Sequence, residues 1–188
     1  MLDNDLFRGE LVHLVAEDPQ KMAEAFSRWQ RDSEYWRLLA SDAAYTNSVR
    51  AIKTRIEKEI EQVPPASMFL IRTLEDDRLI GDVGLDPVRD GHGDTFVGIA
   101  IGEREYWGKG YGSDAMRVIL RYAFTELNLH RVSLNVFEYN PRAVRSYEKV
   151  GFKHEGRSRS VLHRAGRRWD LIFMGILFEE WEAQPKKN

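Results

Sequence analysis

Three glycines at alternate positions, Gly108, Gly110 and Gly112, lie in the stretch EREYWGKGYGSDAM, directly before a helix-like pattern of apolar residues. A glycine leaves its backbone N–H uncovered, and the first N–H groups of a helix have no partner within that helix. Together with the positive end of the helix dipole, such groups bind anions. Lys109 lies among the glycines and adds a positive charge. The segment is therefore a candidate anion-binding site.

Other interpretations of the glycine segment are two phosphate-binding motifs and a plain turn. A loop of the Gly-x-x-x-x-Gly-Lys-Ser/Thr type is excluded, because Lys109 precedes Gly110 and no Ser or Thr follows a Gly-Lys pair. A dinucleotide fingerprint G-x-G-x-x-A fits Gly110 to Ala115, with Glu138 as the ribose-binding acid. Against it, the stretch EREYWGK separates the motif from the preceding strand, and hairpins flank the single crossover. A flexible turn would account for one glycine but not for three.

Hydrophobic periodicity predicts the elements that position this segment. Strands are predicted at residues 10–18, 67–74, 79–88, 95–102 and 131–139, with a closing hairpin that turns near Ala165-Gly166. Helices are predicted at residues 19–31, 46–63 and 112–127, and from Asn140 to Gly151. This order predicts an α/β fold, a mixed and mostly antiparallel sheet with one right-handed β-loop-α-β crossover in its middle.

Composition limits the class of protein. The chain has 188 residues, 43% of them hydrophobic and 31% charged, which predicts one globular domain over residues 1–188. It has no cysteine, which excludes disulfides, thiolate metal ligands and a cysteine-linked acyl-enzyme. The N-terminus lacks the layout of a signal peptide, and the longest apolar run, Leu171–Phe178, is too short to cross a bilayer. We therefore expect a cytoplasmic location and no membrane partner.

The formal net charge is −2, but the charges are unevenly distributed. Between Arg104 and Arg168 there are 14 Lys and Arg against 6 Asp and Glu. This distribution suits an anionic ligand on one half and a cationic ligand on the other. We expect the basic half to lack interleaved exposed aromatic residues, and it has no recognition-helix signature, so we expect no nucleic acid partner. The five histidines show no metal-ligand spacing, so we expect no metal.

A second motif lies downstream, where Asn140 precedes Tyr147 by seven residues in NPRAVRSYEKVGF. With both motifs the chain resembles the GNAT superfamily of N-acetyltransferases, and most closely the branch of the ribosomal-protein N-terminal acetyltransferases. The resemblance covers nearly the whole chain and is specific from Phe96 to Phe152. The superfamily's coenzyme motif is Gln/Arg-x-x-Gly-x-Gly/Ala, and this chain departs from it at the first position, where it has Trp107.

The resemblance implies a GNAT-like acyl-CoA N-acyltransferase fold in which the strands at 95–102 and 131–139 splay apart and admit the pantetheine arm of acetyl-CoA. A backbone N–H of the first strand then polarises the thioester carbonyl. Asn140 hydrogen-bonds the arm, and Tyr147 protonates the leaving thiolate as general acid. The coenzyme-binding residues that the resemblance implies are Ile99, Ala100, Ile101, Trp107, Gly108, Lys109, Gly110, Tyr111, Gly112, Ser113, Asn135 and Asn140. Candidates for the 3′-phosphate of coenzyme A are Arg142, Arg145 and Lys149.

The general base is the open part of this site. In similar N-terminal acetyltransferases a glutamate lies five residues before the signature asparagine, and here that position is Asn135, which cannot accept a proton as a base. We favour Glu103 as the catalytic base, because it follows the strand under the thioester. The remaining candidates are Glu138, Asp82 and Asp170.

These expectations describe an N-acetyltransferase that moves an acetyl group from acetyl-CoA to a primary amine by direct attack in a ternary complex. The acceptor is a protein N-terminus or a small-molecule amine, and the resemblance places its wall at Tyr35, Trp36 and the helix at 46–63. The alternative is a catalytically inactive acyl-CoA-binding regulatory module, which the departure at Asn135 favours. Exposed strand edges permit a homodimer.

Overall fold

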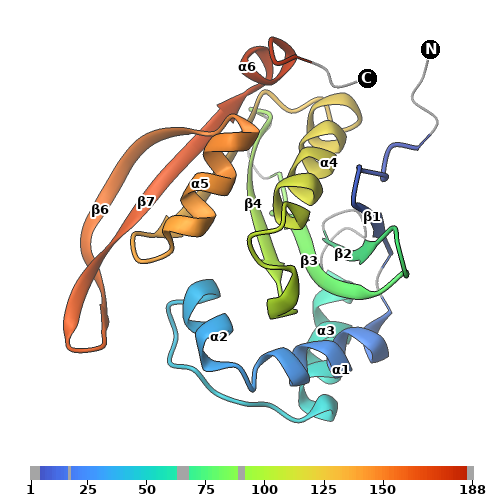
Figure 1. The fold of residues 1–188 in the computed structure, drawn as a ribbon, viewed down its shortest axis with the longest axis vertical. Helices are drawn as coiled ribbons and strands as arrows, with labels where there is room; N and C mark the ends of the chain where they lie inside the picture. The colour runs from blue at the N-terminus through green and yellow to red at the C-terminus, as the bar shows by residue number, and fades with distance from the viewer. Residues whose placement is uncertain (1–4, 17, 63–67, 89–91, 186–188) are drawn as a thin grey trace.

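A seven-stranded sheet with the strand order β1-β2-β3-β4-β5-β7-β6 forms the centre of the computed structural model, which describes residues 5–16, 18–62, 68–88 and 92–185 (Figure 1). β4 and β5 are parallel, and every other neighbouring pair is antiparallel. The strands are β1 (Val12–Val15), β2 (Met68–Thr73), β3 (Leu79–Leu85), β4 (Asp94–Ile101), β5 (Arg131–Phe137), β6 (Lys153–Arg164) and β7 (Arg167–Leu177). The predicted α/β class and mostly antiparallel sheet are confirmed.

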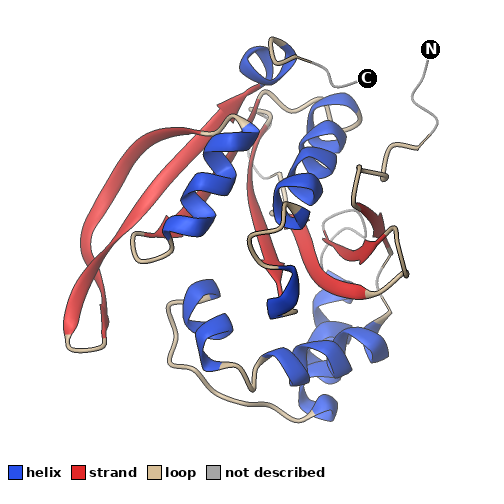
Figure 2. Cartoon of the chain, viewed as in Figure 1, coloured by secondary structure: helices blue, strands red, loops and turns tan. Residues whose placement is uncertain are grey.

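The helices form two groups (Figure 2). They are α1 (Pro19–Trp29), α2 (Ser33–Leu39), α3 (Val49–Gln62), α4 (Tyr111–Thr125), α5 (Pro141–Val150) and α6 (Phe178–Glu182), with a 3-10 turn η2 (Arg104–Tyr106). Because strand side chains alternate between the faces of a sheet, Leu70 and Ile71 point to opposite faces. Leu70 packs with α1 and α3 in one cluster, whereas Ile71 belongs to the larger core that α4 covers.

Local polar residues start and stop the helices as predicted. Asp18 accepts hydrogen bonds from the first free N–H groups of α1, and Pro19 takes the first helical position. Asn140 Oδ1 accepts the N–H of Ala143 at 3.2 Å and caps α5. α5 ends at Gly151, whose φ of 107° lies in the left-handed region that glycine adopts without strain.

Helix α2 is not among the predicted helices. Its seven residues are too few to show an apolar repeat at helical spacing. The available signal is the N-cap, because the carboxylate of Asp32 accepts the N–H of Glu34 at 3.0 Å. The missed helix matters, since α2 forms a wall of the cavity described below.

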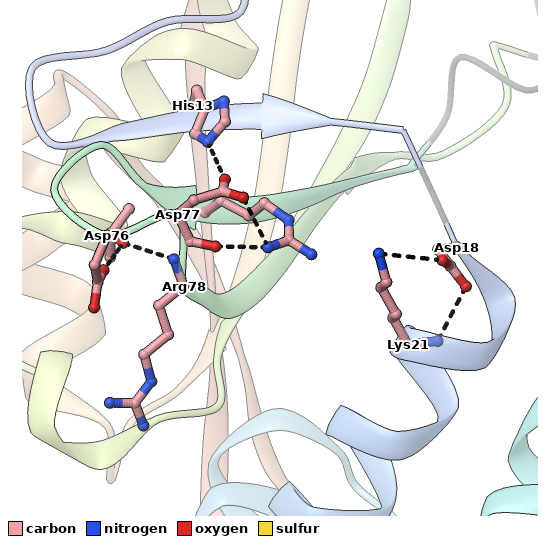
Figure 3. Close-up of polar contacts among 8 residues, drawn as sticks. His13, Asp18, Lys21, Asp76, Asp77 and Arg78 are labelled. Atoms are coloured by element: carbon pink, nitrogen blue, oxygen red, sulfur yellow. Dashed lines mark hydrogen bonds and ion pairs between the residues drawn. The ribbon is translucent and has the colours of Figure 1, made fainter.

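The turn between β2 and β3 is fixed by its own polar side chains (Figure 3). The carboxylate of Asp77 lies 2.9 Å from His13 Nε2 on β1, and Thr73 Oγ1 accepts the N–H of Arg78 at 3.0 Å. These contacts hold the start of β3, from which the Arg78 guanidinium reaches Glu103 beyond the end of β4.

β4 and β5 pair only where both strands begin. The parallel ladder joins Asp94–Phe96 to Arg131–Ser133 and then stops. From there β4 continues to Ile101 against β3, and β5 continues to Phe137 against β7. The inner edges of the two strands therefore diverge, which confirms the predicted splay.

One buried carboxylate attaches the N-terminal segment to α4. Asp114 accepts hydrogen bonds from the N–H groups of Glu10, Leu11 and Val12, at 3.1, 2.7 and 3.1 Å. A side chain at Gly9 would meet this carboxylate, because a Cβ there would lie 2.3 Å from Asp114 Oδ2. The first strand of the sheet is thus fixed to the first turn of α4.

We expect Asp114→Ala to lower the free energy of unfolding by about 3 kcal/mol, because it leaves buried N–H groups without acceptors. Urea denaturation checks this, with Glu59→Ala as the control. Glu59 lies on the exposed face of α3, and its carboxylate contact with a described residue is that with Arg55 at 3.7 Å. A loss no larger than that of the control would contradict the role given to Asp114.

Candidate active site

A cavity of about 530 Å³ occupies the gap between β4 and β5. Most of the predicted coenzyme-binding residues line it, together with the predicted acid. They are Ile99, Ala100, Ile101, Trp107, Gly108, Gly110, Gly112, Ser113, Asn135, Asn140 and Tyr147. Lys109 and Tyr111, also predicted, belong to the same loop but do not line the cavity. Motifs far apart in the sequence thus meet in one place.

The glycine loop leaves open space at the mouth of the cavity. Gly108 and Gly110 have φ of 71° and 96°, a region that residues with a side chain rarely adopt. A Cβ at Gly108 would meet no atom within 4 Å. Gly110 is the N-cap of α4 and supplies no side-chain hydrogen bond to the helix. The first N–H groups of α4 and its positive dipole end therefore suit a phosphate.

Trp107, the departure from the coenzyme motif, has a structural role of its own. Its Nε1 donates to the carbonyl of Ile101 at 2.6 Å, at the end of β4. The guanidinium of Arg142 stacks on the indole at 4.0 Å from the ring centroid, and that of Arg104 lies at 5.0 Å. Trp107 therefore satisfies a strand carbonyl that β5 does not reach and bridges β4 to α5.

Tyr147 lies on α5 and is half-buried in the cavity wall. Burial raises the pKa of Tyr147 to about 12. The phenol therefore stays protonated at neutral pH and can donate a proton. The preceding residue, Ser146, is hydrogen-bonded to Ser113 at 2.7 Å, which fixes α5 to the first turn of α4.

The side-chain NH2 group of Asn140 is available to a ligand. The side-chain oxygen caps α5, whereas within the described part of the chain Nδ2 donates to no acceptor. Asn140 is 9% exposed and lines the cavity. A ligand with an amide carbonyl, such as a pantetheine arm, offers the acceptor that Nδ2 lacks.

Three cations follow one face of α5 along the cavity. Arg142, Arg145 and Lys149 are spaced three and four residues apart and all line the cavity. Among the described residues, no carboxylate forms an ion pair with any of them. Most other arginines near the site are paired, as Arg28, Arg78 and Arg104 are. The α5 face therefore carries positive charge that is available to an anion.

Glu103, the predicted base, lies outside this cavity and lines a smaller one beside α1. Its carboxylate accepts hydrogen bonds from Arg28 at 2.5 Å, Trp29 Nε1 at 2.9 Å and Arg78 at 3.2 Å. Burial acts to raise the pKa of Glu103, but the hydrogen bonds from Trp29 and Arg28 and the charges of Arg28 and Arg78 outweigh it and lower the pKa. These contacts fix the end of α1 to the end of β4, and a base role for Glu103 stays a prediction.

The substitute bases differ in their surroundings. Asp170 accepts from Arg157 at 3.0 Å and from the N–H of Ser160 at 2.9 Å. Asp82 lies close to buried Tyr35, where burial first and the charge of Asp82 second raise the tyrosine pKa. Neither Asp82 nor Asp170 lines the cavity, and the same holds for Glu138.

Only some of the residues predicted for the acceptor wall line the cavity. Tyr35 lines it, but Trp36 and the predicted helix at 46–63 do not. Trp36 packs edge-on against Tyr45, and α3 packs on α1 in a separate cluster. The cavity is also lined by residues that sequence reasoning missed: Leu38, Leu39, Asp86, Phe96 and Phe137. Only the cap at Asp32 could have indicated the α2 members of this set.

The described part of the chain offers neither a metal-binding group nor a membrane-spanning helix. No group of three or more His, Asp or Glu side chains there could hold a metal ion. No helix in the same ranges has the length and apolar character needed to cross a bilayer.

Known proteins match this chain over most of its length. The model of the family "Acetyltransferase (GNAT) domain" matches residues 8–153. The Bacillus subtilis protein named "Putative ribosomal N-acetyltransferase YdaF" is 28% identical, over 91% of this chain and 92% of its own length. The "Probable N-acetyltransferase YjcK" of the same species is 35% identical over 77% of this chain and 80% of its own.

A solved structure shares the fold. It is that of spermidine N-acetyltransferase from Vibrio cholerae in complex with CoA and spermine, with a TM-score of 0.79 and 27% identity. The match covers 91% of this chain and 98% of that one. The family predicted from the two sequence motifs is confirmed.

The lowered pKa of Glu103 predicts a pH-dependent contribution to stability. A carboxylate with a depressed folded-state pKa stabilises above its unfolded-state value, here 4.5, and the contribution is lost as the pH falls through the lower folded-state pKa. We expect Glu103→Gln to be less stable than the wild type at pH ~7, with the difference shrinking below pH ~4. Urea denaturation across that range measures it, with exposed Glu61→Gln as control. An equal difference at every pH would contradict the assignment.

Proposed function

The chain belongs to the GNAT family of acetyltransferases and is an acetyl-CoA-dependent N-acetyltransferase, and from this premise we propose how its residues carry out the transfer. The amine attacks acetyl-CoA directly, in a ternary complex, inside the cavity between β4 and β5. The single observation that carries the proposal is that the glycine loop, Asn140 and Tyr147 line one cavity where the two strands diverge. We propose that residues 1–188 act as one domain.

In this proposal the coenzyme occupies the cavity from the loop inward. The N–H groups of Gly108–Ser113 bind the pyrophosphate, and Lys109 adds charge from outside the cavity. The 3′-phosphate binds the positive face of α5 at Arg142, Arg145 or Lys149. The pantetheine arm pairs with the inner edge of β4 at Ile99–Ile101, which β5 leaves unpaired. Asn140 Nδ2 donates to an amide carbonyl of the arm.

The chemical step needs an acid at the sulfur and an acceptor for the amine proton. The amine nitrogen forms a bond to the thioester carbon while a backbone N–H of β4 stabilises the oxyanion, and the C–S bond then breaks. Tyr147 gives its proton to the thiolate. Glu103, to which we assign the role of base, lies outside the cavity. Water must therefore carry the proton from the amine to its carboxylate.

The acceptor is a primary amine, and we propose a small-molecule amine or a protein N-terminus. We propose that the amine binds where Tyr35, Leu38, Leu39, Asp86 and Phe96 line the cavity, a region we call the outer cavity. The lining of this region combines one carboxylate with apolar and aromatic side chains. A carboxylate attracts a protonated amine, and the apolar wall excludes water once the amine is bound. The Vibrio cholerae neighbour, crystallised with spermine, supports the small-molecule class.

Two expectations beyond the site remain proposals. The sheet ends at β6, an edge strand on which Val161 is 50% exposed, and such an edge supports a homodimer. Sedimentation measures this directly. A cytoplasmic location rests on the sequence pattern alone and is checked by microscopy of the tagged protein.

Calorimetric titration with acetyl-CoA, with NAD as comparison, tests the proposal first. Saturable acetyl-CoA binding without an NAD response is expected, followed by thiol release with spermidine or with a hexapeptide that has a free N-terminus. NAD binding alone would support the dinucleotide interpretation. Acetyl-CoA binding without turnover of either amine would favour the inactive regulatory module.

Gly108→Ala should raise the Kd for acetyl-CoA at least tenfold, or ~1.4 kcal/mol, because its Cβ would stand in the open loop. Gly166→Ala is a matched control. Gly166 has φ of 77°, and a Cβ there would also meet nothing within 4 Å, but it lies at the tip of the β6–β7 hairpin. Equal Kd values for the two variants would contradict the phosphate site.

Tyr147→Phe should lower kcat about 100-fold while the Kd for acetyl-CoA stays within about twofold, because only the proton donor is removed. Since the pKa of Tyr147 is raised to about 12, the wild-type rate should not fall between pH ~7 and ~10 through titration of this phenol. Stopped assays of thiol release measure both. Tyr122→Phe, in the core on α4, is the control, and an equal loss in both variants would exclude an acid role for Tyr147.

A further inference from the structure

One guanidinium joins the β6–β7 hairpin to the wall of the cavity. Arg164, the last residue of β6, donates from Nη1 to the carbonyl of Arg37 at 2.6 Å and to Tyr139 Oη at 2.6 Å. Its Nη2 donates to the three carbonyls of residues 40–42, at 3.1, 3.1 and 2.8 Å. The hairpin projects from the sheet on the side of α2 (Figure 1). A single side chain thus binds four backbone carbonyls that lie more than 120 positions away in the sequence.

One of the four carbonyls, that of Arg37, lies in the last turn of α2, where carbonyls have no N–H partner within the helix. The other three follow the helix, which ends at Leu39, and Ala40 is extended with φ of −126° and ψ of 153°. A positive charge at this end also complements the negative end of the helix dipole. Arg164 therefore fixes both the end of α2 and the path of residues 40–42.

The other end of α2 is held by a different arginine. The guanidinium of Arg104, in the turn after β4, is paired with the N-cap carboxylate of Asp32 and donates to Glu34 at 2.6 Å. Tyr35, Leu38 and Leu39 lie between the two anchors and line the cavity. The acceptor wall is therefore a short helix clamped at each end by a residue from outside it.

Tyr139 connects the Arg164 anchor to the end of β5, directly before the Asn140–Tyr147 motif. Its hydroxyl donates to the carbonyl of Arg37 at 2.5 Å and accepts from Arg164. Its ring stacks on Phe137 at 5.2 Å between centroids and meets Trp169 edge-on at 5.1 Å. Phe137 lines the cavity. Arg164 thereby sets the distance between α2 and the end of β5.

We propose that Arg164 is a positioning residue that determines how the enzyme binds its amine acceptor. Arg164 touches no reacting atom and acts through α2, by holding Leu38 and Leu39 in the wall of the outer cavity. The glycine loop and the cationic face of α5 make no described hydrogen bond with Arg164, so coenzyme binding does not depend on it. The inference rests on the proposed function, because it assigns the outer cavity to the amine.

Steady-state kinetics of Arg164→Ala and Arg164→Lys test the proposal, with spermidine and the free hexapeptide as amine probes. The KM for the amine should rise about tenfold in Arg164→Ala, since small displacements of a positioning element cost this much or more, while the KM for acetyl-CoA should stay within about twofold. Arg164→Lys keeps the charge but loses the fork that reaches several carbonyls, so it should show a smaller rise in the same KM.

The matched control is Arg168→Ala, which removes the same charge from the same hairpin. Arg168 is exposed, and among the described residues its side chain donates only to the carbonyl of Ser160, at 3.4 Å. Both KM values should be unchanged. Amide hydrogen exchange on the same proteins provides a readout free of activity: exchange in residues 33–42 should quicken in Arg164→Ala and not in Arg168→Ala, with the Gly108–Ser113 loop unaffected.

The outcomes separate this inference from the proposed function. An active wild type with no change in the amine KM of Arg164→Ala, or an equal rise of the KM for acetyl-CoA, overturns the role of Arg164 alone. Unchanged exchange in residues 33–42 overturns it as well. A wild type that acetylates neither amine overturns the proposed function, and the role of Arg164 with it.

Discussion

The site depends on the early end of the pairing between β4 and β5. Unpaired N–H and C=O groups on a strand edge are costly unless water or another group satisfies them. Here the outer neighbours β3 and β7 hold the two strands in place while their inner edges separate after Phe96. Trp107 satisfies one free carbonyl, that of Ile101. A ligand with amide groups can satisfy the others, so the opening in the sheet is itself a binding surface.

Arginines and carboxylates hold the helices around this opening. Glu103 binds the end of α1 through Arg28 and Trp29, and Arg104 binds the start of α2. Exposed pairs of this kind contribute little to stability singly, but these contacts add to the apolar cluster that Ala25, Trp29, Tyr35 and Ala100 form between the same elements. The carboxylates of Glu103 and Asp32 therefore position the walls of the cavity, and Glu103 itself lies outside it.

Sequence patterns foresaw the parts of the site that are local. The three glycines, the cap at Asn140 and the position of Tyr147 follow from short motifs, and the divergence of β4 and β5 followed from the family resemblance. The contacts of Glu103 with α1 and of Arg164 with α2 could not be predicted, because they join residues 74 to 127 positions apart and no periodicity marks them. Helix α2 was hidden for another reason: tertiary hydrogen bonds rather than an apolar repeat stabilise its seven residues.

Asp114 has a consequence for the chain's first residues. The carboxylate that holds residues 10–12 belongs to the turn of α4 next to the glycine loop, one residue after Ser113. We expect that detaching the first strand from the sheet loosens the turn to which we assign the coenzyme phosphates. A ligand that binds only while the strand is attached adds its binding free energy to the cost of that detachment. If coenzyme binds there, it therefore protects residues 10–12 from proteases, although these residues lie outside the cavity.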